Sequence, residues 1–166
     1  EGRKLSTRDI LHSRMRLPDG RYIDFIVNHH PSKFGGEGAS EGRRYAAMTA
    51  LKELCDSIGN VNVVAMGDFN DSPEGAAFQL IDGTLTNKGM ELHRKGEGTI
   101  RYEGRWELID MFLTGPGVDA EMEICRMPFH IVRESKHPGE KPFRTYSGPR
   151  YIGGISDHFP VVLKIF

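Results

Sequence analysis

The sequence has few cysteines, no excess of charge of one sign and no long apolar run. Its 166 residues include two cysteines, Cys55 and Cys125, and carry a formal net charge of -1. Two cysteines without metal-type spacing are too few for a disulfide framework, so we expect both to be small core residues. A nearly neutral chain has no global field that recruits nucleic acid or a membrane, although a local basic rim or a metal can still attract a polyanionic substrate.

Targeting and membrane-spanning segments are also missing. We find no signal-peptide pattern, and no apolar run approaches the ~20 residues needed to cross a bilayer. Because the first residue is Glu1 and not an initiator methionine, this absence leaves the compartment open between cytoplasmic and extracytoplasmic. The hydrophobic fraction of 38% and the charged fraction of 27% are those of an ordinary soluble globular protein.

The first half of the chain predicts a hairpin followed by alternating helix and strand. No repeat, low-complexity tract or linker interrupts the sequence, so we expect residues 1–166 to form a single domain. Apolar periodicity and turn residues predict these elements in order: strands at 9–15 and 21–28 joined by a turn, a loop at 31–40, a helix at 41–58, a buried strand at 61–66, and a helix that has Ser72 as its N-cap and Pro73 at its first position and continues to Ile81.

The second half predicts strands without helices. Strand-like segments cover residues 98–102, 106–113, 120–126 and 159–166, and residues 128–155 read as a long surface loop rich in proline, glycine and basic residues. Two helices amid about seven strands predict the α/β class, as a layered sandwich with a mixed or mainly antiparallel sheet.

A polar motif follows the buried strand at 61–66. The segment is Gly67-Asp68-Phe69-Asn70-Asp71. Because side chains alternate along a strand, Asp68 and Asn70 are expected on one side and Phe69 on the other, and Gly67 allows close approach at the strand end. A carboxylate beside a carboxamide at the mouth of a core strand suits chemistry. The alternative is an ordinary turn, because Asp, Asn and Gly are common turn residues.

Three further polar sites adjoin apolar strands: Asn28-His29, Asp110 and Asp157-His158. If the strands share a rim, these side chains converge with Asp68 in one crevice. Oxygen ligands favour magnesium or manganese, and histidines beside carboxylates supply proton transfer, so the set predicts a metal-dependent phosphoester site. A zinc site is disfavoured because no helix carries two histidines four residues apart and no cysteine pairs occur. Ser-His-Asp hydrolysis is disfavoured because no Gly-x-Ser-x-Gly motif occurs.

The order of these motifs resembles that of a known superfamily. His29, then residues 67–73, then Trp106-Glu107-Leu108-Ile109-Asp110, then Ser156-Asp157-His158-Phe159-Pro160-Val161 resembles the endonuclease/exonuclease/phosphatase superfamily over most of the chain. The segments Asn28–Gly36 and Tyr151–Ile155 are similar to those of a bacterial subgroup of uncharacterised hydrolases. The resemblance implies a deoxyribonuclease I-like fold and hydrolysis of phosphodiester or phosphomonoester bonds with Mg²⁺ or Mn²⁺.

The resemblance also implies five catalytic residues. His158 would be the general base or the partner of the attacking water, and Asp110 would hold its tautomer. Asp68 would position or activate the water, and Asn70 would bind the phosphate beside it. His29 would stabilise the charge that develops on the phosphoryl oxygens.

The remaining roles concern the metal and the substrate. Asp157 and Asp68 would be metal ligands. Asn70, Arg44 and Lys33 would contact the substrate. For Arg44 the alternative of a solvated charge on the helix stays open.

One departure from the family affects the expected activity. Its members carry an asparagine and the main metal-binding glutamate in an N-terminal half that has no counterpart before Asp9. The chain is therefore expected to be only the C-terminal half of the fold, with weak activity alone. The alternative is a catalytically incomplete fragment that assembles with the N-terminal half of the same enzyme or, as a homo-oligomer, with a second copy, since a bare apolar sheet face rarely persists in a monomer.

The substrate itself is left open between nucleic acid, a phospholipid headgroup and a sugar phosphate, because the catalytic residues contact only the phosphate. The loop from Arg126 to Arg150 contains six Lys/Arg and two acidic residues, with Phe129, Phe143 and Tyr146 among them. Such a segment suits phosphates and bases of nucleic acid. A solvated surface loop is the alternative.

Overall fold

The computed structural model describes residues 8–33 and 36–166. A five-stranded sheet lies at its centre in the order β1 (Leu11–Arg16), β2 (Tyr22–His29), β3 (Val63–Asp68), β7 (Asp110–Thr114) and β4 (Thr86–Asn87). Strands β2 and β3 are parallel, and the other neighbours are antiparallel. The sheet is therefore mixed, as the sequence predicted.

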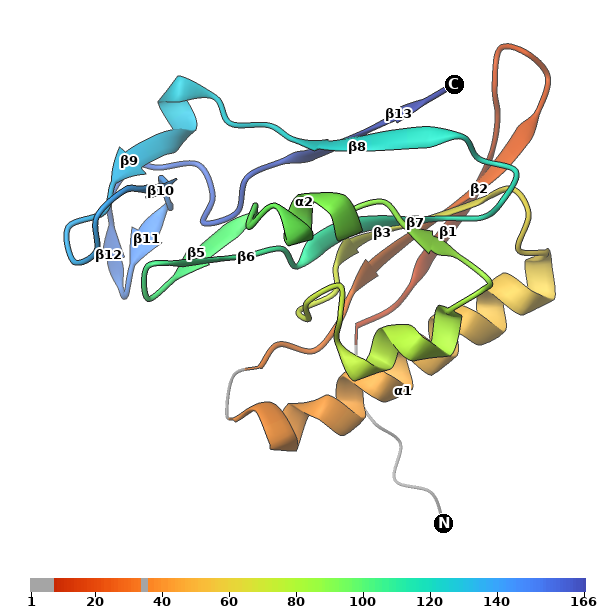
Figure 1. Cartoon of the computed structure of the whole chain (residues 1–166), viewed down its shortest axis with the longest axis horizontal. Helices are drawn as coiled ribbons and strands as arrows, with labels where there is room; N and C mark the ends of the chain where they lie inside the picture. The colour runs from red at the N-terminus through yellow and green to blue at the C-terminus, as the bar shows by residue number, and fades with distance from the viewer. Residues whose placement is uncertain (1–7, 34–35) are drawn as a thin grey trace.

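Two layers cover this sheet (Figure 1). Helix α1 (Glu37–Ile58) lies against one face, where Met48 and Leu51 pack with Ile26, Ala65 and Leu113 of the strands. A two-stranded antiparallel sheet of β8 (Ala120–Ile124) and β13 (Val161–Ile165) lies across the other face. Its core joins Ala120, Val161 and Leu163 to Ile23, Val64 and Phe112. The alternation of side chains along each strand thus fills two cores, one on each face.

Helix α1 begins earlier than the sequence predicted. The expected start at Glu41 used Ser40 as a boundary, but the helix begins at Glu37. Ser40 lies inside the first turns, where its Oγ donates to the Gly36 carbonyl and accepts from Arg44 Nη1. Phe34 and Gly35, which belong to the expected loop at 31–40, lie outside the described residues.

The expected helix from Ser72 is wrong. Only a 3-10 helix, η1 (Ala76–Ile81), forms there, and Gly75 before it is extended with φ -60° and ψ 146°. Asp71, which Arg44 of α1 contacts at 3.3 Å, lies so close to Gly75 that a Cβ there would be 2.6 Å from its carboxyl carbon. The chain therefore packs against that side chain in place of starting a regular α-helix.

The region between residues 82 and 114 is more divided than expected. A short helix, α2 (Met90–Arg94), and strand β4 form where no element was predicted. The single strand predicted at 106–113 is two: β6 (Arg105–Glu107), which pairs with β5 (Ile100–Tyr102), and β7. Leu108 and Ile109 between them are buried, so their apolar character continued the strand pattern without belonging to a strand.

The long surface loop expected at 128–155 is also wrong. It contains the 3-10 helix η2 (Pro128–His130) and two hairpins, β9 (Ile131–Arg133) with β10 (Glu140–Pro142) and β11 (Tyr146–Ser147) with β12 (Arg150–Tyr151). Strands of two or three residues are too short to give an alternating pattern. These hairpins lie together at one end of the molecule, beside β5 and β6 (Figure 1).

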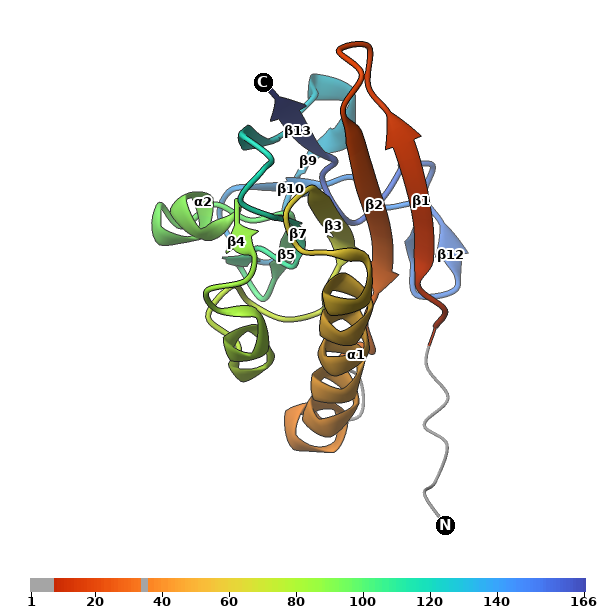
Figure 2. The same ribbon diagram turned by 90° about the vertical axis from the view of Figure 1, so that its right-hand side faces the viewer.

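The central sheet has β4 at one edge and β1 at the other, where β1 pairs with β2 (Figure 2). All six residues of β1 are exposed.

Within the described part of the chain, no helix combines the length and apolarity required to cross a membrane.

Candidate active site

Strand register brings three polar side chains side by side. His29 at the end of β2 is the Cα partner of Asp68 at the end of β3, and Asp68 is the partner of Asp110 at the start of β7. Two residues away from them along their strands lie Val27, Met66 and Phe112, in that order. These three apolar residues are on the face of the sheet that the β8–β13 layer covers. By the alternation of strands the three polar side chains therefore lie on the sheet face opposite α1.

His158 reaches this rim from the other layer, just before β13. Its Nδ1 lies 2.8 Å from Asp110 Oδ2, and the hydroxyl of buried Thr99 donates to the same oxygen at 2.5 Å. One ligand atom from each of Asp68, Asp110 and His158 falls within 4.8 Å of the others. Residues 68, 110 and 158 therefore form one compact cluster, half-buried at every member.

His29 and Asn70 surround Asp68. Nε2 of His29 lies 3.5 Å from Asp68 Oδ2. The other carboxylate oxygen, Oδ1, accepts the backbone N–H of Asn70 at 2.8 Å, and the Asn70 amide donates to the His30 carbonyl at 2.9 Å. Asn70 has a φ of +50°, a left-handed conformation that Asn tolerates better than most residues. Phe69 points to the opposite side and is fully buried, as the alternation predicted.

Two ionisable groups of the cluster are shifted. Burial and the nearby charge of Asp110 raise the pKa of Asp68, against opposing contributions from the Asn70 backbone, His158 and His29. Burial alone would lower the pKa of His158, but the hydrogen bond and charge of Asp110, with the charges of Asp68 and Asp157, outweigh it and raise that pKa. Both shifts reflect the same arrangement, in which carboxylates and an imidazole lie close together at a half-buried rim.

Gly67 makes the close approach of β2 and β3 possible. Its φ is +132°, and a Cβ there would lie 2.0 Å from the carbonyl oxygen of Asn28. No side chain fits at that position without moving a strand. The glycine of the Gly67–Asp71 motif therefore fixes the spacing between His29 and Asp68.

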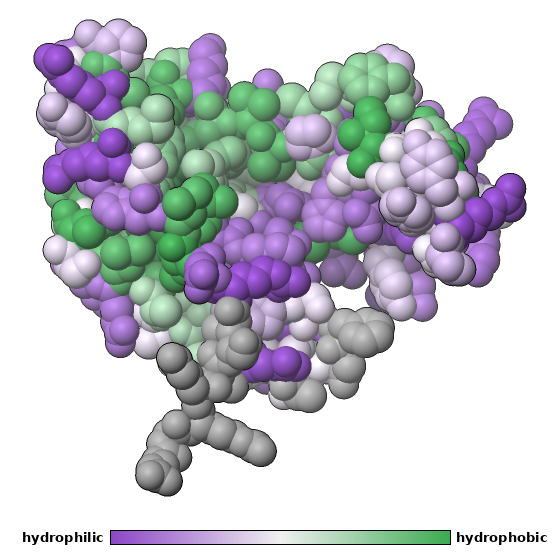
Figure 3. Space-filling model, turned by 180° about the vertical axis from the view of Figure 1, so that it is seen from behind, coloured by the Kyte–Doolittle hydropathy of each residue, from purple (hydrophilic) through white to green (hydrophobic). Residues whose placement is uncertain are grey.

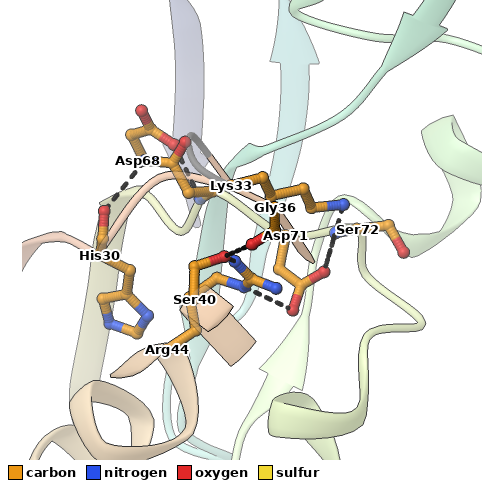
Figure 4. A network of polar contacts seen from close by, with 9 residues as sticks. His30, Lys33, Gly36, Ser40, Arg44, Asp68, Asp71 and Ser72 are labelled. Carbon is orange, nitrogen blue, oxygen red and sulfur yellow. Dashed lines mark hydrogen bonds and ion pairs between the residues drawn. The ribbon is translucent and has the colours of Figure 1, made fainter. Parts of the chain in front are cut away.

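Arg44 is not a solvated charge on the helix. Its side chain is 2% exposed, and its Nε lies 3.3 Å from Asp71 Oδ2 while Nη1 donates to Ser40 Oγ at 2.7 Å. Lys33 Nζ lies 3.7 Å from the other oxygen of Asp71. Figure 4 shows Arg44 and Lys33 on either side of the Asp71 carboxylate. Arg44 thus contacts the loop after β3 from the buried side, whereas Lys33 is partly exposed on the other side of Asp71.

A pocket of about 690 Å³ adjoins the cluster. Its wall includes Lys33, Asn70, Tyr102 and Asp157. Asp157 is exposed and does not belong to the group of atoms formed by residues 68, 110 and 158. The structure thus brings His29, Asp68, Asn70, Asp110 and His158 together, places Lys33 and Asp157 on the adjoining wall, and buries Arg44 behind them.

Two supporting residues were not found from the sequence. Thr99 fixes Asp110 through its hydroxyl, and its carbonyl accepts the N–H of Phe159 at 2.8 Å. His130, 2% exposed, has Nε2 3.0 Å from the carbonyl oxygen of Ser156. Neither stands in a motif, and both are brought to the site by tertiary contacts, so the sequence carried no signal for them.

The cluster suits a divalent cation. Asp68 and Asp110 offer carboxylate oxygens of the kind that Mg²⁺ and Mn²⁺ prefer. The raised pKa of Asp68 reflects in part the repulsion between these carboxylates, which a cation beside them would relieve. His158 Nδ1 is already engaged by Asp110, so the carboxylates are the better ligands.

A family model for the endonuclease/exonuclease/phosphatase family matches residues 1–166. The chain belongs to this family. Its members are hydrolases of phosphoester bonds, so the resemblance found in the motifs is confirmed at the level of the superfamily. A comparison with curated protein sequences gives no match.

Solved structures share the fold of this family member. An endonuclease/exonuclease/phosphatase family protein from Bacteroides thetaiotaomicron has a TM-score of 0.63 at 16% identity, over 94% of this chain and 54% of that one. A Staphylococcus aureus beta toxin variant with bound magnesium ions has a TM-score of 0.60 at 15% identity, over 93% and 56%. Sphingomyelinase C from Streptomyces griseocarneus has a TM-score of 0.58 at 16% identity, over 92% and 56%.

These similarities confirm the predicted α/β, deoxyribonuclease I-like fold. The chain spans only 54–56% of the length of these three structures. That the chain forms the C-terminal half of the fold stays a prediction, which agrees with this coverage.

Proposed function

We propose that the protein hydrolyses phosphoester bonds with a divalent metal, magnesium or manganese, and that His29, Asp68, Asn70, Asp110 and His158 carry the reaction. One observation supports this most strongly: carboxylate and imidazole atoms of Asp68, Asp110 and His158 lie within 4.8 Å of one another beside an open pocket. A phosphoester hydrolase needs an acceptor for the proton of water and a polar surround for the phosphate, and this rim has both.

In the proposed mechanism a water molecule attacks phosphorus while the bond to the leaving oxygen breaks. His158, or Asp68 beside it, accepts the proton of that water. Asp110 keeps His158 in the tautomer with Nδ1 protonated, which leaves Nε2 as the base. Asn70 binds a phosphoryl oxygen, and His29 donates to the charge that grows there. Lys33 offers a further cation at the pocket wall.

The metal would be held by Asp68 and Asp110, with Asp157 on the adjoining wall as a further acidic ligand. When bound, it neutralises phosphate charge and lowers the barrier to attack by water. For Arg44 we propose a role other than the expected substrate contact. Because its guanidinium is buried, it would position Asp71 and the loop that carries Asn70.

A turnover assay with bis-p-nitrophenyl phosphate and Mg²⁺, repeated with Mn²⁺ and with EDTA, tests this function. His158→Ala, Asp68→Ala and Asn70→Ala should each lower the rate by about 10²-fold or more, as for loss of a general base or an oxyanion donor. His93→Ala, a histidine of α2 outside the pocket, is the matched control. Wild-type rates in His158→Ala would refute the assignment.

A second candidate is that the chain alone is catalytically incomplete. Within the described residues, 8–33 and 36–166, one group of three possible metal ligands is found, Asp68, Asp110 and His158. Only two of these three side chains are carboxylates. We propose that another ligand comes from the N-terminal half of the same fold.

An uncovered apolar face supports this second candidate. Leu11, Met15 and Val27 are 64%, 53% and 39% exposed on the face of β1 and β2 that turns toward the β8–β13 layer. Seen from behind, hydrophobic side chains gather over this side of the molecule (Figure 3). We propose that the N-terminal half, or a second copy in a homo-oligomer, covers it. A monomeric mass in sedimentation equilibrium of the chain alone would contradict coverage by a second copy.

A further inference from the structure

A second pocket lies beside the candidate active site. Its volume is about 540 Å³, and it lies between the β5–β6 hairpin and the hairpins β9–β12. Tyr102, which is 63% exposed, belongs to the walls of both pockets. The two pockets therefore share Tyr102 as a common wall residue.

The lining of this second pocket is strongly basic. It contains six Lys/Arg side chains and two carboxylates, Glu103 and Glu134. The cations are Arg101, Arg133, Lys136, Lys141, Arg144 and Arg150. In a chain whose formal net charge is -1, such a concentration of one sign raises the local concentration of anions.

Four of these cations have no carboxylate partner in the part of the chain that the structure describes: Arg133, Lys136, Arg144 and Arg150. Lys141 is paired with Glu134 at 2.7 Å. Arg101 instead donates to the backbone carbonyls of Gly104, Pro138 and Glu140, which fixes the pocket wall. Nε of Arg144 is buried without a hydrogen-bond acceptor. An unmet guanidinium donor is unfavourable, and a bound anion would provide an acceptor for this side chain.

The wall of the second pocket is also bonded to the segment that carries His158. The Phe143 carbonyl accepts the N–H of Ile155 at 2.8 Å, and Thr145 Oγ1 donates to the Ile155 carbonyl at 2.8 Å. Gly154 lies so close that a Cβ there would be 2.1 Å from the Phe143 oxygen. Ser156, Asp157 and His158 follow directly. The basic pocket is therefore held in a fixed position relative to the catalytic cluster.

We propose that this pocket binds a second phosphate group of the substrate, next to the phosphate that is hydrolysed. The inference rests on the proposed phosphoesterase function and narrows its substrate class. Arginine forks match the oxygens of phosphate, and three of the four unpaired cations are arginines. A zwitterionic choline headgroup is a poorer match. It has only one phosphate, and the basic lining would repel its quaternary ammonium group.

The second phosphate has two chemical sources. It belongs to the neighbouring phosphodiester of a nucleic-acid strand or to a polyphosphorylated polyol. The Tyr102 ring distinguishes them, because an exposed aromatic side chain stacks on a nucleobase and gains little from a polyol.

Binding measured in EDTA tests the proposal without any need for turnover. A fluorescein-labelled oligothymidylate is titrated with the chain, and inositol 1,4,5-trisphosphate or dimethyl phosphate is added as competitor. Arg133→Gln/Arg150→Gln, which changes two exposed arginines, should weaken binding of at least one polyphosphate probe by about tenfold. If the oligonucleotide is the ligand, the slope of log K against log salt should become shallower by about 1.4, for two lost phosphate contacts.

Arg43→Gln/Arg94→Gln is the matched control, because it removes the same charge from the exposed faces of α1 and α2. If the second phosphate comes from a nucleic-acid strand, Tyr102→Ala should weaken binding of the oligonucleotide. If it comes from a polyol, Tyr102→Ala should leave competition by inositol trisphosphate unchanged. Equal losses in the two double variants would overturn the proposal. So would competition by dimethyl phosphate that matches that of the trisphosphate.

Failure of this proposal can be told apart from failure of the proposed function. Absence of metal-dependent turnover of bis-p-nitrophenyl phosphate would remove the proposed function, and the EDTA titrations would still report on the anion site. Conversely, normal turnover with unchanged polyphosphate binding in Arg133→Gln/Arg150→Gln would remove only the second-phosphate site.

Discussion

His158 and Asp110 form a hydrogen-bonded pair across the two layers of the molecule, with His158 Nδ1 2.8 Å from Asp110 Oδ2. Asp110 lies in the central sheet, whereas His158 precedes β13 of the covering sheet. Thr99 and the backbone of Phe159 join the two ends of this pair. The relative position of the layers thus sets the position of the candidate base.

Asp110→Asn should lower the pKa of His158, because it removes the negative charge and the hydrogen bond that raise it. The imidazolium would then lose its proton at a lower pH, which a titration of the His158 ring by NMR measures. Turnover should fall as well, because the amide no longer fixes the productive tautomer. An unchanged His158 titration would show that the pair does not exist in solution.

His130→Phe should lower turnover by about tenfold through the position of the 156–158 segment. The His130 ring packs edge-on against Phe159 and bonds to the Ser156 carbonyl; phenylalanine keeps the first contact and loses the second. His130→Gln, which retains a donor, should recover part of kcat. A fall in thermal stability with unchanged kcat would mean that His130 supports the fold alone.

Stability should fall as the pH decreases from about 6.5 to 4, because of His30. Burial, with the charges of His29 and Arg44, lowers the pKa of His30 to about 4. In this pH range the unfolded chain therefore binds a proton that the folded chain excludes. The free energy of unfolding should fall by up to about 3 kcal/mol across this window. Urea unfolding at several pH values measures it. In His30→Phe, which has no titrating ring, the same decline should be smaller, and an identical decline would contradict the assignment.

Gly67→Ala should destabilise the protein by about 3 kcal/mol or more, because a Cβ would overlap the Asn28 carbonyl and the φ of +132° is unfavourable for alanine. Gly83→Ala is the matched control: its φ is +75° but open space surrounds it, so a loss of about 1 kcal/mol is expected. Denaturant unfolding of both variants checks the difference. Equal losses would show that β2 and β3 can separate at this point.

Cys55 should not react with a thiol reagent in the folded protein. It is fully buried, and burial together with the charge of Asp56 raises its pKa to about 11. Cys125 is half-buried, so native protein should release one equivalent from 5,5′-dithiobis(2-nitrobenzoate) and denatured protein two. Rapid release of two equivalents without denaturant would contradict the packing of α1.

The strands of the core were predictable because their residues carry strong local signals. Val63, Val64 and Ala65 form a continuous apolar run, and the Pro18-Asp19-Gly20 turn joins β1 and β2 as expected. The helix at Ser72 and the loop at 128–155 were wrong for the opposite reason. Gly75 packs against an Asp71 side chain that distant Arg44 contacts, and strands as short as Tyr146–Ser147 have no periodicity to detect.

Arg44 shows the limit of reading single residues. The sequence left a substrate contact and a solvated charge open, and neither anticipates a guanidinium buried against Asp71. Burial of a charge depends on which partner the fold supplies, and Asp71 is 27 residues away along the chain.

By itself the sequence determined the family, the strands that carry the candidate residues and the residue types at their ends, because motif order and hydrophobic alternation are properties of the chain. Only the tertiary structure decided that His29, Asp68 and Asp110 are lateral neighbours, that Thr99 and His130 support the site, and that six cations share a pocket with Tyr102. Strand register and the packing of one layer on another depend on contacts between residues far apart in sequence, and such contacts leave no local pattern.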